Sequence, residues 1–259
     1  MINTMLNGLS VVNVELTSRC NKSCWMCGRR QLPNFEGEDM DISLVHNIAS
    51  QLPPDIIVQL HDNGEPLLYP LLGEAFDAFK FQIKCLDTNG KLLVVKSEEI
   101  IGKLDTITIS TFENDPEAEL QYQILKEFIR LKGDKPPMVI VRTLGNVFPK
   151  RYEELGCLIA KRTIHSPNGS FNYRKERVIP EHGICLDMMS HLAIKANGNV
   201  AHCVRFDPEG KGIIGNLAES SLNRIWNGLI RKQYLDAHIA GKRADVPLCA
   251  SCDYWGVPG

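Results

Sequence analysis

The stretch LSVVNVELTSRCNKSCWMC (Leu9–Cys27) decides the fold of this 259-residue chain. Its first part, Leu9–Leu16, is rich in valine and predicts a buried β-strand. Three cysteines, Cys20, Cys24 and Cys27, follow this strand with the spacing C-x3-C-x2-C. Three thiolates on one loop can hold an iron–sulfur cluster or zinc, and three ligands leave one metal corner open for a substrate or cofactor. The alternative is a zinc loop that a distant His or Cys completes.

Beyond this loop, strand-like and helix-like segments alternate along the chain. The predicted strands are Ile56–Leu60, Phe81–Leu86, Thr106–Thr111 and Met138–Val141, and the predicted helices are Ile42–Leu52 with Asp41 as N-cap, Leu71–Phe81, a helix opened by Asp115-Pro116, and Tyr152–Lys161. Five βα units in sequence predict an α/β fold with a parallel sheet, either a partial barrel or a doubly wound sheet. In both folds, functional residues gather at the C-terminal ends of the strands.

The βα alternation ends at about residue 183, where a β-hairpin and two short helices are expected. These elements are His191–Lys195 and Val200–Val204 around Asn197-Gly198, then Ser221–Trp226 and Arg231–Ile239. We therefore predict a main domain over residues 1–183 and a smaller domain over residues 184–259.

A second set of cysteines lies in the predicted small domain. Its members are Cys185, Cys203, Cys249 and Cys252, and the last two form a C-x2-C knuckle. Four cysteines in a small domain predict a closed metal site, for which zinc is the simplest occupant when this set is read alone. A chain with zinc at both sets would be a non-enzymatic structural module, but that reading leaves the five βα units unexplained.

The cysteine loop and its place after the first strand resemble the radical S-adenosylmethionine (SAM) enzymes, which have partial βα barrels. Trp25 and Met26 stand where that family has an aromatic or apolar residue before the last cysteine. The resemblance implies that Cys20, Cys24 and Cys27 bind a 4Fe–4S cluster whose fourth iron is chelated by SAM. It also implies that SAM is cleaved to a radical, which takes a hydrogen atom from the substrate.

Two further segments resemble motifs of the same family. Asn63-Gly64-Glu65-Pro66 is similar to its G-G-E-P segment, which contacts the SAM amino group, and Thr88-Asn89-Gly90 is similar to its T-N-G segment. A carboxylate and backbone carbonyls can accept hydrogen bonds from an ammonium, and glycine allows close backbone approach. The cofactor-binding residues that the resemblance implies are Trp25, Met26, Asn63, Gly64, Glu65, Pro66, Thr88, Asn89 and Ser110, with Thr111 beside the last. The family's glycine-rich segment after the fifth strand is not clear, because Arg142-Thr143-Leu144-Gly145 stands there.

The C-terminal region resembles the twitch domain, the smaller relative of the SPASM domain. The resemblance implies that the second cysteine set holds an auxiliary 4Fe–4S cluster. A cluster with four protein ligands has no open iron, so its use is electron transfer. We therefore expect the two-electron oxidation of a small sugar- or cyclitol-like alcohol. The alternatives within the same family are an epimerase and a peptide-modifying maturase.

Oxidation of an alcohol also requires a base for the hydroxyl proton. The candidate catalytic residues are Arg142, after the fifth strand, and His61, with Asp62 as a further alternative. Cys85 and Cys157 belong to neither cysteine set; if either faced the site, it could donate a hydrogen atom, and the reaction would become an epimerisation. The segment from His165 to Arg177 is a possible lid.

The composition excludes several other classes of protein. The net charge of −2 gives no case for a nucleic-acid or anionic-membrane partner. No apolar run approaches the roughly 18–20 residues of a membrane span, and the N-terminus does not resemble a secretory signal. We expect a cytoplasmic protein with unpaired cysteines, and the family resemblance implies an electron donor such as flavodoxin or ferredoxin. Eight Lys and Arg residues against three Glu between Arg142 and Pro180 are compatible with a solvated surface or with a basic wall for an anionic substrate.

Overall fold

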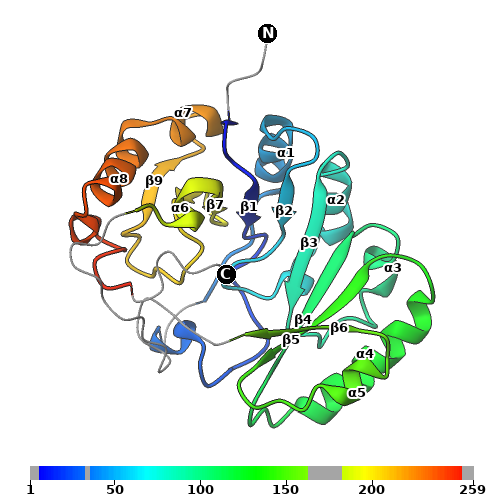
Figure 1. The fold of residues 1–259 in the computed structure, drawn as a ribbon. Helices are drawn as coiled ribbons and strands as arrows, with labels where there is room; N and C mark the ends of the chain where they lie inside the picture. The colour runs from blue at the N-terminus through cyan, green and yellow to red at the C-terminus, as the bar shows by residue number, and fades with distance from the viewer. Residues whose placement is uncertain (1–5, 33–35, 163–182, 253–259) are drawn as a thin grey trace.

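The computed structural model describes residues 6–32, 36–162 and 183–252 (Figure 1). In this part of the chain one nine-stranded sheet has the order β6-β5-β4-β3-β2-β1-β7-β8-β9. The strands are β1 Val11–Val14, β2 Ile57–Gln59, β3 Ile83–Thr88, β4 Thr106–Phe112, β5 Met138–Leu144, β6 Leu158–Arg162, β7 His191–Ile194, β8 Asn199–Ala201 and β9 Ile213–Asn216. The first six strands pair in chain order and in parallel, which confirms the predicted α/β barrel-type sheet.

Most of the helices lie on the outer side of the sheet, whereas α6 lies beside β7 on its inner side (Figure 1). The helices are α1 Ile42–Gln51, α2 Leu72–Ala78, α3 Ser97–Ile100, α4 Ala118–Lys132, α5 Lys150–Glu153, α6 Leu186–Ser190, α7 Leu222–Trp226 and α8 Leu229–Ile239, with 3-10 turns η2 Gly28–Gln31, η3 Pro66–Leu68 and η4 Arg243–Asp245. The predicted cap of α1 is present, because the Asp41 carboxylate accepts a hydrogen bond of 2.8 Å from the Ser43 N–H. Such a cap satisfies one of the free N–H groups at the start of the helix.

The C-terminal hairpin continues the same sheet. Strand β7 pairs in parallel with β1, and the antiparallel strands β8 and β9 follow it (Figure 1). The C-terminal region also contacts the segment before β1, because the Trp226 indole donates a hydrogen bond of 3.0 Å to the Asn7 carbonyl. The two parts predicted from the sequence therefore share one sheet, and the boundary at residues 183–184 stays a prediction.

One predicted element was wrong. The segment Tyr152–Lys161 was expected to be a helix, but the structure has the short helix α5, a turn at Gly156 and then the strand β6. Gly156 has a φ of 78°, a left-handed conformation that residues other than glycine rarely adopt. This conformation turns the chain away from the helical path just after the end of α5. Strand β6 pairs with β5 and places Arg162 beside Leu144 at the C-terminal end of the sheet.

Two expectations concern the remaining parts of the chain. The possible lid, from His165 to Arg177, lies outside the described residues. In the described residues, none of the helices combines the length and apolar character that a membrane crossing requires.

Candidate functional site

The cysteine loop, residues 17–27, leaves the C-terminal end of β1 and lies against the segment that follows β2. The Glu65 N–H donates a hydrogen bond of 2.7 Å to the Arg19 carbonyl. A Cβ atom at Gly64 would lie 1.9 Å from the Thr17 carbonyl oxygen, so only glycine fits there. The predicted Gly64-Glu65-Pro66 motif therefore holds the base of the cysteine loop.

The three thiols of this loop lie close enough to influence one another's charge. Burial raises the pKa of Cys24 to about 12; the Lys22 ammonium opposes this effect, and Cys27 and Cys20 reinforce it. Burial likewise raises the pKa of Cys20. Metal binding requires thiolates, so an occupant of this loop must displace these protons. A cationic iron cluster supplies that driving force, and three neighbouring thiols fit the predicted three-cysteine site.

Glu65 is buried, and its carboxylate is already used within the protein. It accepts hydrogen bonds from the Leu67 N–H at 3.0 Å, the Thr88 hydroxyl at 2.7 Å and the Asn89 N–H at 2.7 Å. In the structure, this side chain joins the two predicted motifs. Its predicted contact with the SAM amino group stays a prediction.

Asn89 connects this turn to the first cysteine. Its side-chain N–H₂ group lies 3.9 Å from the Cys20 sulfur and donates a 2.8 Å hydrogen bond to the Asn21 side-chain oxygen. Hydrogen bonds to cluster sulfurs are one of the factors that set the reduction potential of an iron–sulfur cluster. Asn89 is therefore placed to support a cluster at Cys20.

The second cysteine set gathers at the start of α6, after β8 and after η4. Burial raises the pKa of Cys249 to about 12, and Cys252 and Cys185 add to the effect. Burial also raises the pKa of Cys203, and the neighbouring Cys249 adds to this increase. The buried Arg243 guanidinium donates hydrogen bonds to the carbonyls of Cys249 and Cys252, which fixes the knuckle.

The two cysteine sets suit clusters in which each thiol binds a different iron. None of the nine cysteines forms a disulfide. Across residues 6–32, 36–162 and 183–252, no three Cys, His, Asp or Glu side chains converge on one point in the way that a single metal ion requires. Each set nevertheless consists of mutually neighbouring thiols, and a 4Fe–4S cluster takes such thiols at separate corners.

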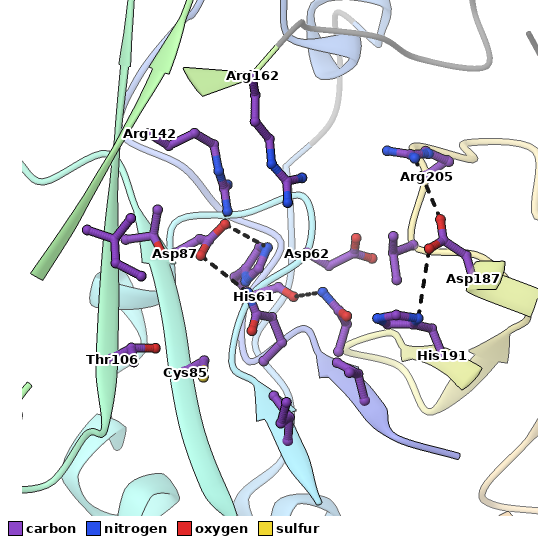
Figure 2. Close-up of a pocket in the computed structure, with 17 residues that line it drawn as sticks. His61, Asp62, Cys85, Asp87, Thr106, Arg142, Arg162, Asp187, His191 and Arg205 are labelled. Carbon is purple, nitrogen blue, oxygen red and sulfur yellow. Dashed lines mark hydrogen bonds and ion pairs between the residues drawn. The ribbon is translucent and has the colours of Figure 1, made fainter. Parts of the chain in front are cut away.

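A cavity of about 540 Å³ opens on the inner face of the sheet, and its lining includes neighbours of the second cysteine set (Figure 2). Its polar lining residues are Asn13, Gln59, His61, Asp62, Cys85, Asp87, Thr106, Thr108, Arg142, Arg162, Asp187, His191 and Arg205. A cavity of this volume is within the range of small-molecule sites. Both parts of the chain contribute to it, because Asp187, His191 and Arg205 come from the C-terminal region.

Asp87 is the centre of the first polar group in the cavity. Its carboxylate forms an ion pair with Arg142 and lies 3.4 Å from the His61 Nε2 atom (Figure 2). Burial opposes ionisation, but His61 and Arg142 hold the pKa of Asp87 below its usual range. The structure thus brings the two predicted catalytic residues together around an aspartate that the sequence analysis missed.

His61 has the properties of a base. Burial lowers its pKa; Asp87 opposes this effect, while Arg142 and Arg162 add to it. The Nε2 atom of His61 faces Asp87, and its Nδ1 atom is buried and has no hydrogen-bond partner among the described residues. Arg142, in contrast, is committed to Asp87 as a charged donor.

Asp62, the other base considered, follows His61 and also lines the cavity. It forms an ion pair with Lys195, although burial, with Glu15 nearby, raises the pKa of Asp62 to about 7. Glu15 also accepts a hydrogen bond of 3.1 Å from the Asn63 N–H. These contacts connect the end of β1, the loop after β2 and the C-terminal hairpin.

The C-terminal wall of the cavity carries a second polar group. Asp187 lies 3.8 Å from the His191 Nδ1 atom and 3.6 Å from the Arg205 Nη2 atom (Figure 2). Asp187 and Arg205 each follow a cysteine of the second set by two residues. The sequence analysis missed them, although this spacing was a signal that they would lie beside the cysteines.

Other predicted residues lie around the cavity rather than in its lining. The Trp25 indole donates a 3.3 Å hydrogen bond to the Glu113 carbonyl, Pro66 is buried in η3, and the Thr111 hydroxyl donates to the Arg142 carbonyl at 3.2 Å. The Ser110 carbonyl accepts a 3.0 Å hydrogen bond from Gln121. Met26 belongs to the cysteine loop. Of the two remaining cysteines, Cys85 lines the cavity and Cys157 lies in the hydrophobic core.

Comparisons with known proteins agree with this arrangement. Residues 185–253 match the SPASM family, described as an iron–sulfur cluster-binding domain. The chain is 24% identical to an S-adenosyl-L-methionine-dependent 2-deoxy-scyllo-inosamine dehydrogenase from Niallia circulans, over 94% of this chain and 92% of the relative.

Solved structures share the fold. BtrN in complex with AdoMet and 2-DOIA has a TM-score of 0.64 at 18% identity, with 95% of this chain and 93% of that chain covered. Streptococcus suis SuiB bound to the precursor peptide SuiA has a TM-score of 0.63 at 13% identity, with 97% and 72% covered. AdoMet-bound anSMEcpe has a TM-score of 0.60 at 12% identity, with 96% and 92% covered. The chain therefore has the fold of these proteins, and its residues 185–253 match the SPASM iron–sulfur domain.

Proposed function

We propose that this protein is a radical SAM dehydrogenase that oxidises a hydroxyl group of a small sugar- or cyclitol-like molecule. The observation that carries the proposal is the cavity on the inner face of the sheet, with an acid–base group on one wall and a charged group from the SPASM-matching region on the other. The similarity to a dehydrogenase over nearly the whole length of both chains supports the reaction class.

Each cysteine set has a separate task. Cys20, Cys24 and Cys27 hold the cluster that binds SAM, and Cys185, Cys203, Cys249 and Cys252 hold the auxiliary cluster. When bound, SAM and its cluster supply a radical that removes a hydrogen atom, and the auxiliary cluster accepts the second electron. Residues 1–183 and 184–259 are then two functional parts of one continuous sheet.

The His61–Asp87–Arg142 group takes the hydroxyl proton. His61 is neutral at physiological pH because burial lowers its pKa, so it can accept a proton. Asp87 lies beside its Nε2 atom and stabilises the imidazolium that results. Arg142 is a hydrogen-bond donor that orients Asp87, rather than the base itself.

The charges of the cavity indicate where a substrate would be held. Asp187 can accept hydrogen bonds from substrate hydroxyl or amino groups, and Arg142, Arg162 and Arg205 can bind an anionic group if the substrate carries one. The proposal includes a flavodoxin- or ferredoxin-like electron donor and a cytoplasmic location, where cysteines are kept reduced.

One observation supports a second reaction. Cys85 lines the cavity on β3, two residues before Asp87, so its thiol is accessible to a molecule bound there. A thiol that donated a hydrogen atom to the substrate radical would turn dehydrogenation into epimerisation, and the resulting thiyl radical would take one electron from the electron donor and one proton from solvent to restore the thiol. Cys157 is excluded from this role by its position in the hydrophobic core.

The experiment that tests the proposal uses anaerobically reconstituted enzyme with SAM, a reductant, and 2-deoxy-scyllo-inosamine and related alcohols in deuterated water. Dehydrogenation yields 5′-deoxyadenosine and a carbonyl product in equal amounts. A product with carbon-bound deuterium and no carbonyl would instead show epimerisation, and Cys85→Ala should then abolish the deuterium uptake. Absence of 5′-deoxyadenosine with a fully loaded enzyme and every alcohol would contradict the function itself.

A further inference from the structure

The two cysteine-bearing loops touch each other at Gly28 and Phe206. Gly28 follows Cys27 directly, and Phe206 follows Cys203 by three residues. A Cβ atom at Gly28 would lie 2.4 Å from the Phe206 Cδ1 atom and 2.8 Å from its Cγ and Cε1 atoms. The phenyl ring therefore occupies the space where any other residue at this position would place its side chain.

The glycine at position 28 is required by space and not by backbone conformation. Its φ lies outside the left-handed range, unlike that of Gly37 or Gly210. Other residues could adopt this backbone, so the ring of Phe206 is what excludes them. This makes the contact testable by changing either partner.

The loop that carries the ring is itself held firmly. The Asp207 carboxylate accepts hydrogen bonds from the Lys211 N–H at 3.0 Å and the Gly212 N–H at 2.6 Å, and the Gly210 N–H donates to the Asp207 carbonyl at 3.2 Å. Because Phe206 precedes this turn, its ring is presented from a fixed backbone. The base of the cysteine loop is held separately, through Arg19 and Glu65.

We infer that Phe206 is a positioning residue: it packs against Gly28 and fixes the Cys27 end of the loop that binds SAM through its cluster. The SPASM region then has a role besides electron transfer, since it braces the site at which SAM binds. The inference rests on the proposed function only in assigning a cluster to Cys20, Cys24 and Cys27. It predicts that damage at Phe206 appears at the SAM-binding cluster, which belongs to the other part of the chain.

The test is a double-mutant cycle on the reconstituted holoenzyme, with iron content, the electron paramagnetic resonance (EPR) spectrum of the reduced SAM-binding cluster and the SAM Kd as readouts. Gly28→Ala should raise the SAM Kd by about tenfold or more, because small displacements at such sites have large effects. Phe206→Ala should raise it less, and the double variant should be no worse than Phe206→Ala alone, since removal of the ring makes room for the new methyl group.

Control variants separate this effect from general damage. Gly73→Ala, where a Cβ atom makes only an ordinary contact at 3.6 Å, and Phe148→Ala, which is exposed, should leave all readouts unchanged. The inference is overturned if the increases in SAM Kd of the two single variants add in the double variant. It is also overturned if the Gly28→Ala protein binds SAM normally. If Gly28→Ala does not fold, Phe206→Ala and Phe206→Leu decide, because only the first should weaken SAM binding. A wild-type protein that takes up no iron at its first cysteine set would contradict the proposed function instead.

Discussion

Replacement of Glu65 by glutamine should destabilise the protein and disturb one cluster but not the other. The Glu65 side chain is only 2% exposed, and one carboxylate oxygen accepts from Leu67 and Thr88 while the other accepts from Asn89. Glutamine keeps the size of the side chain but has a single acceptor oxygen. Its N–H₂ group must then face at least one donor, so a buried N–H or hydroxyl loses its partner.

The size of the effect follows from these contacts. A hydrogen bond to a charged group contributes about 1.5–3 kcal/mol, and a buried donor without a partner costs about 1–3 kcal/mol. Part of each contact survives in the variant, so we expect a loss of roughly 2–5 kcal/mol. In a protein of this length, each kcal/mol lowers the Tm by about 2–4 °C, which gives a decrease of roughly 4–20 °C.

The assay compares thermal unfolding and EPR spectra of the reconstituted variant with those of Glu98→Gln, a matched change at an exposed carboxylate. Asn89, which Glu65 holds, lies 3.9 Å from the Cys20 sulfur, so the signal of the SAM-binding cluster should change and that of the auxiliary cluster should not. A Tm within about 2 °C of wild type corresponds to a loss below about one kcal/mol in the free energy of unfolding. This result together with unaltered EPR spectra would refute this reasoning.

Further predictions concern the base and the two cysteine sets. His61→Gln should abolish oxidation of the alcohol while SAM Kd and iron content stay normal, and His46→Gln, on the surface, should have no effect. The base acts in its neutral form and burial lowers the pKa of His61 below 6.5, so the rate should be constant as the pH falls from 8 to 6.5 and should decrease only at lower pH; a decrease centred above pH 7 would exclude His61. Alanine at Cys20, Cys24 and Cys27 should reduce iron from about eight to about four atoms per chain and stop SAM cleavage, whereas alanine at Cys185, Cys203, Cys249 and Cys252 should remove the other four or so. A triple variant that still yields 5′-deoxyadenosine would contradict the assignment of the first set.

Features that depend on neighbouring residues were predictable from the sequence. The cysteine spacings, the Gly64-Glu65-Pro66 turn and the alternation of strands and helices are local patterns. The structure places the first cysteine loop after β1 and the Gly64-Glu65-Pro66 turn after β2, where a hydrogen bond joins them. The β6 region was mispredicted for a related reason. Its helical periodicity is a local signal, but pairing with the adjacent strand β5 decides its structure.

The cavity could not be predicted in the same way, because its parts meet only through long-range pairing. Asp87 lies within a strand, where a single carboxylate gives no sequence signal, and its partners Arg142 and His61 come from β5 and from the loop after β2. Asp187 and Arg205 face the same space only because β7 pairs with β1, which is separated from it by most of the chain. Residues of this kind can be assigned to one site only when it is known which strands lie next to each other in the sheet.

The pairing of β7 with β1 also explains why two cysteine sets can serve one substrate. The first set follows β1, and Cys185 precedes β7, the strand that pairs with β1. A molecule in the cavity therefore meets residues from both parts of the chain: Asp87 and His61 on one wall, Asp187 and Arg205 on the other. The proposed enzyme removes a hydrogen atom at one cluster and an electron at another, so the same substrate must be within reach of both. The shared sheet brings the two walls of the cavity together.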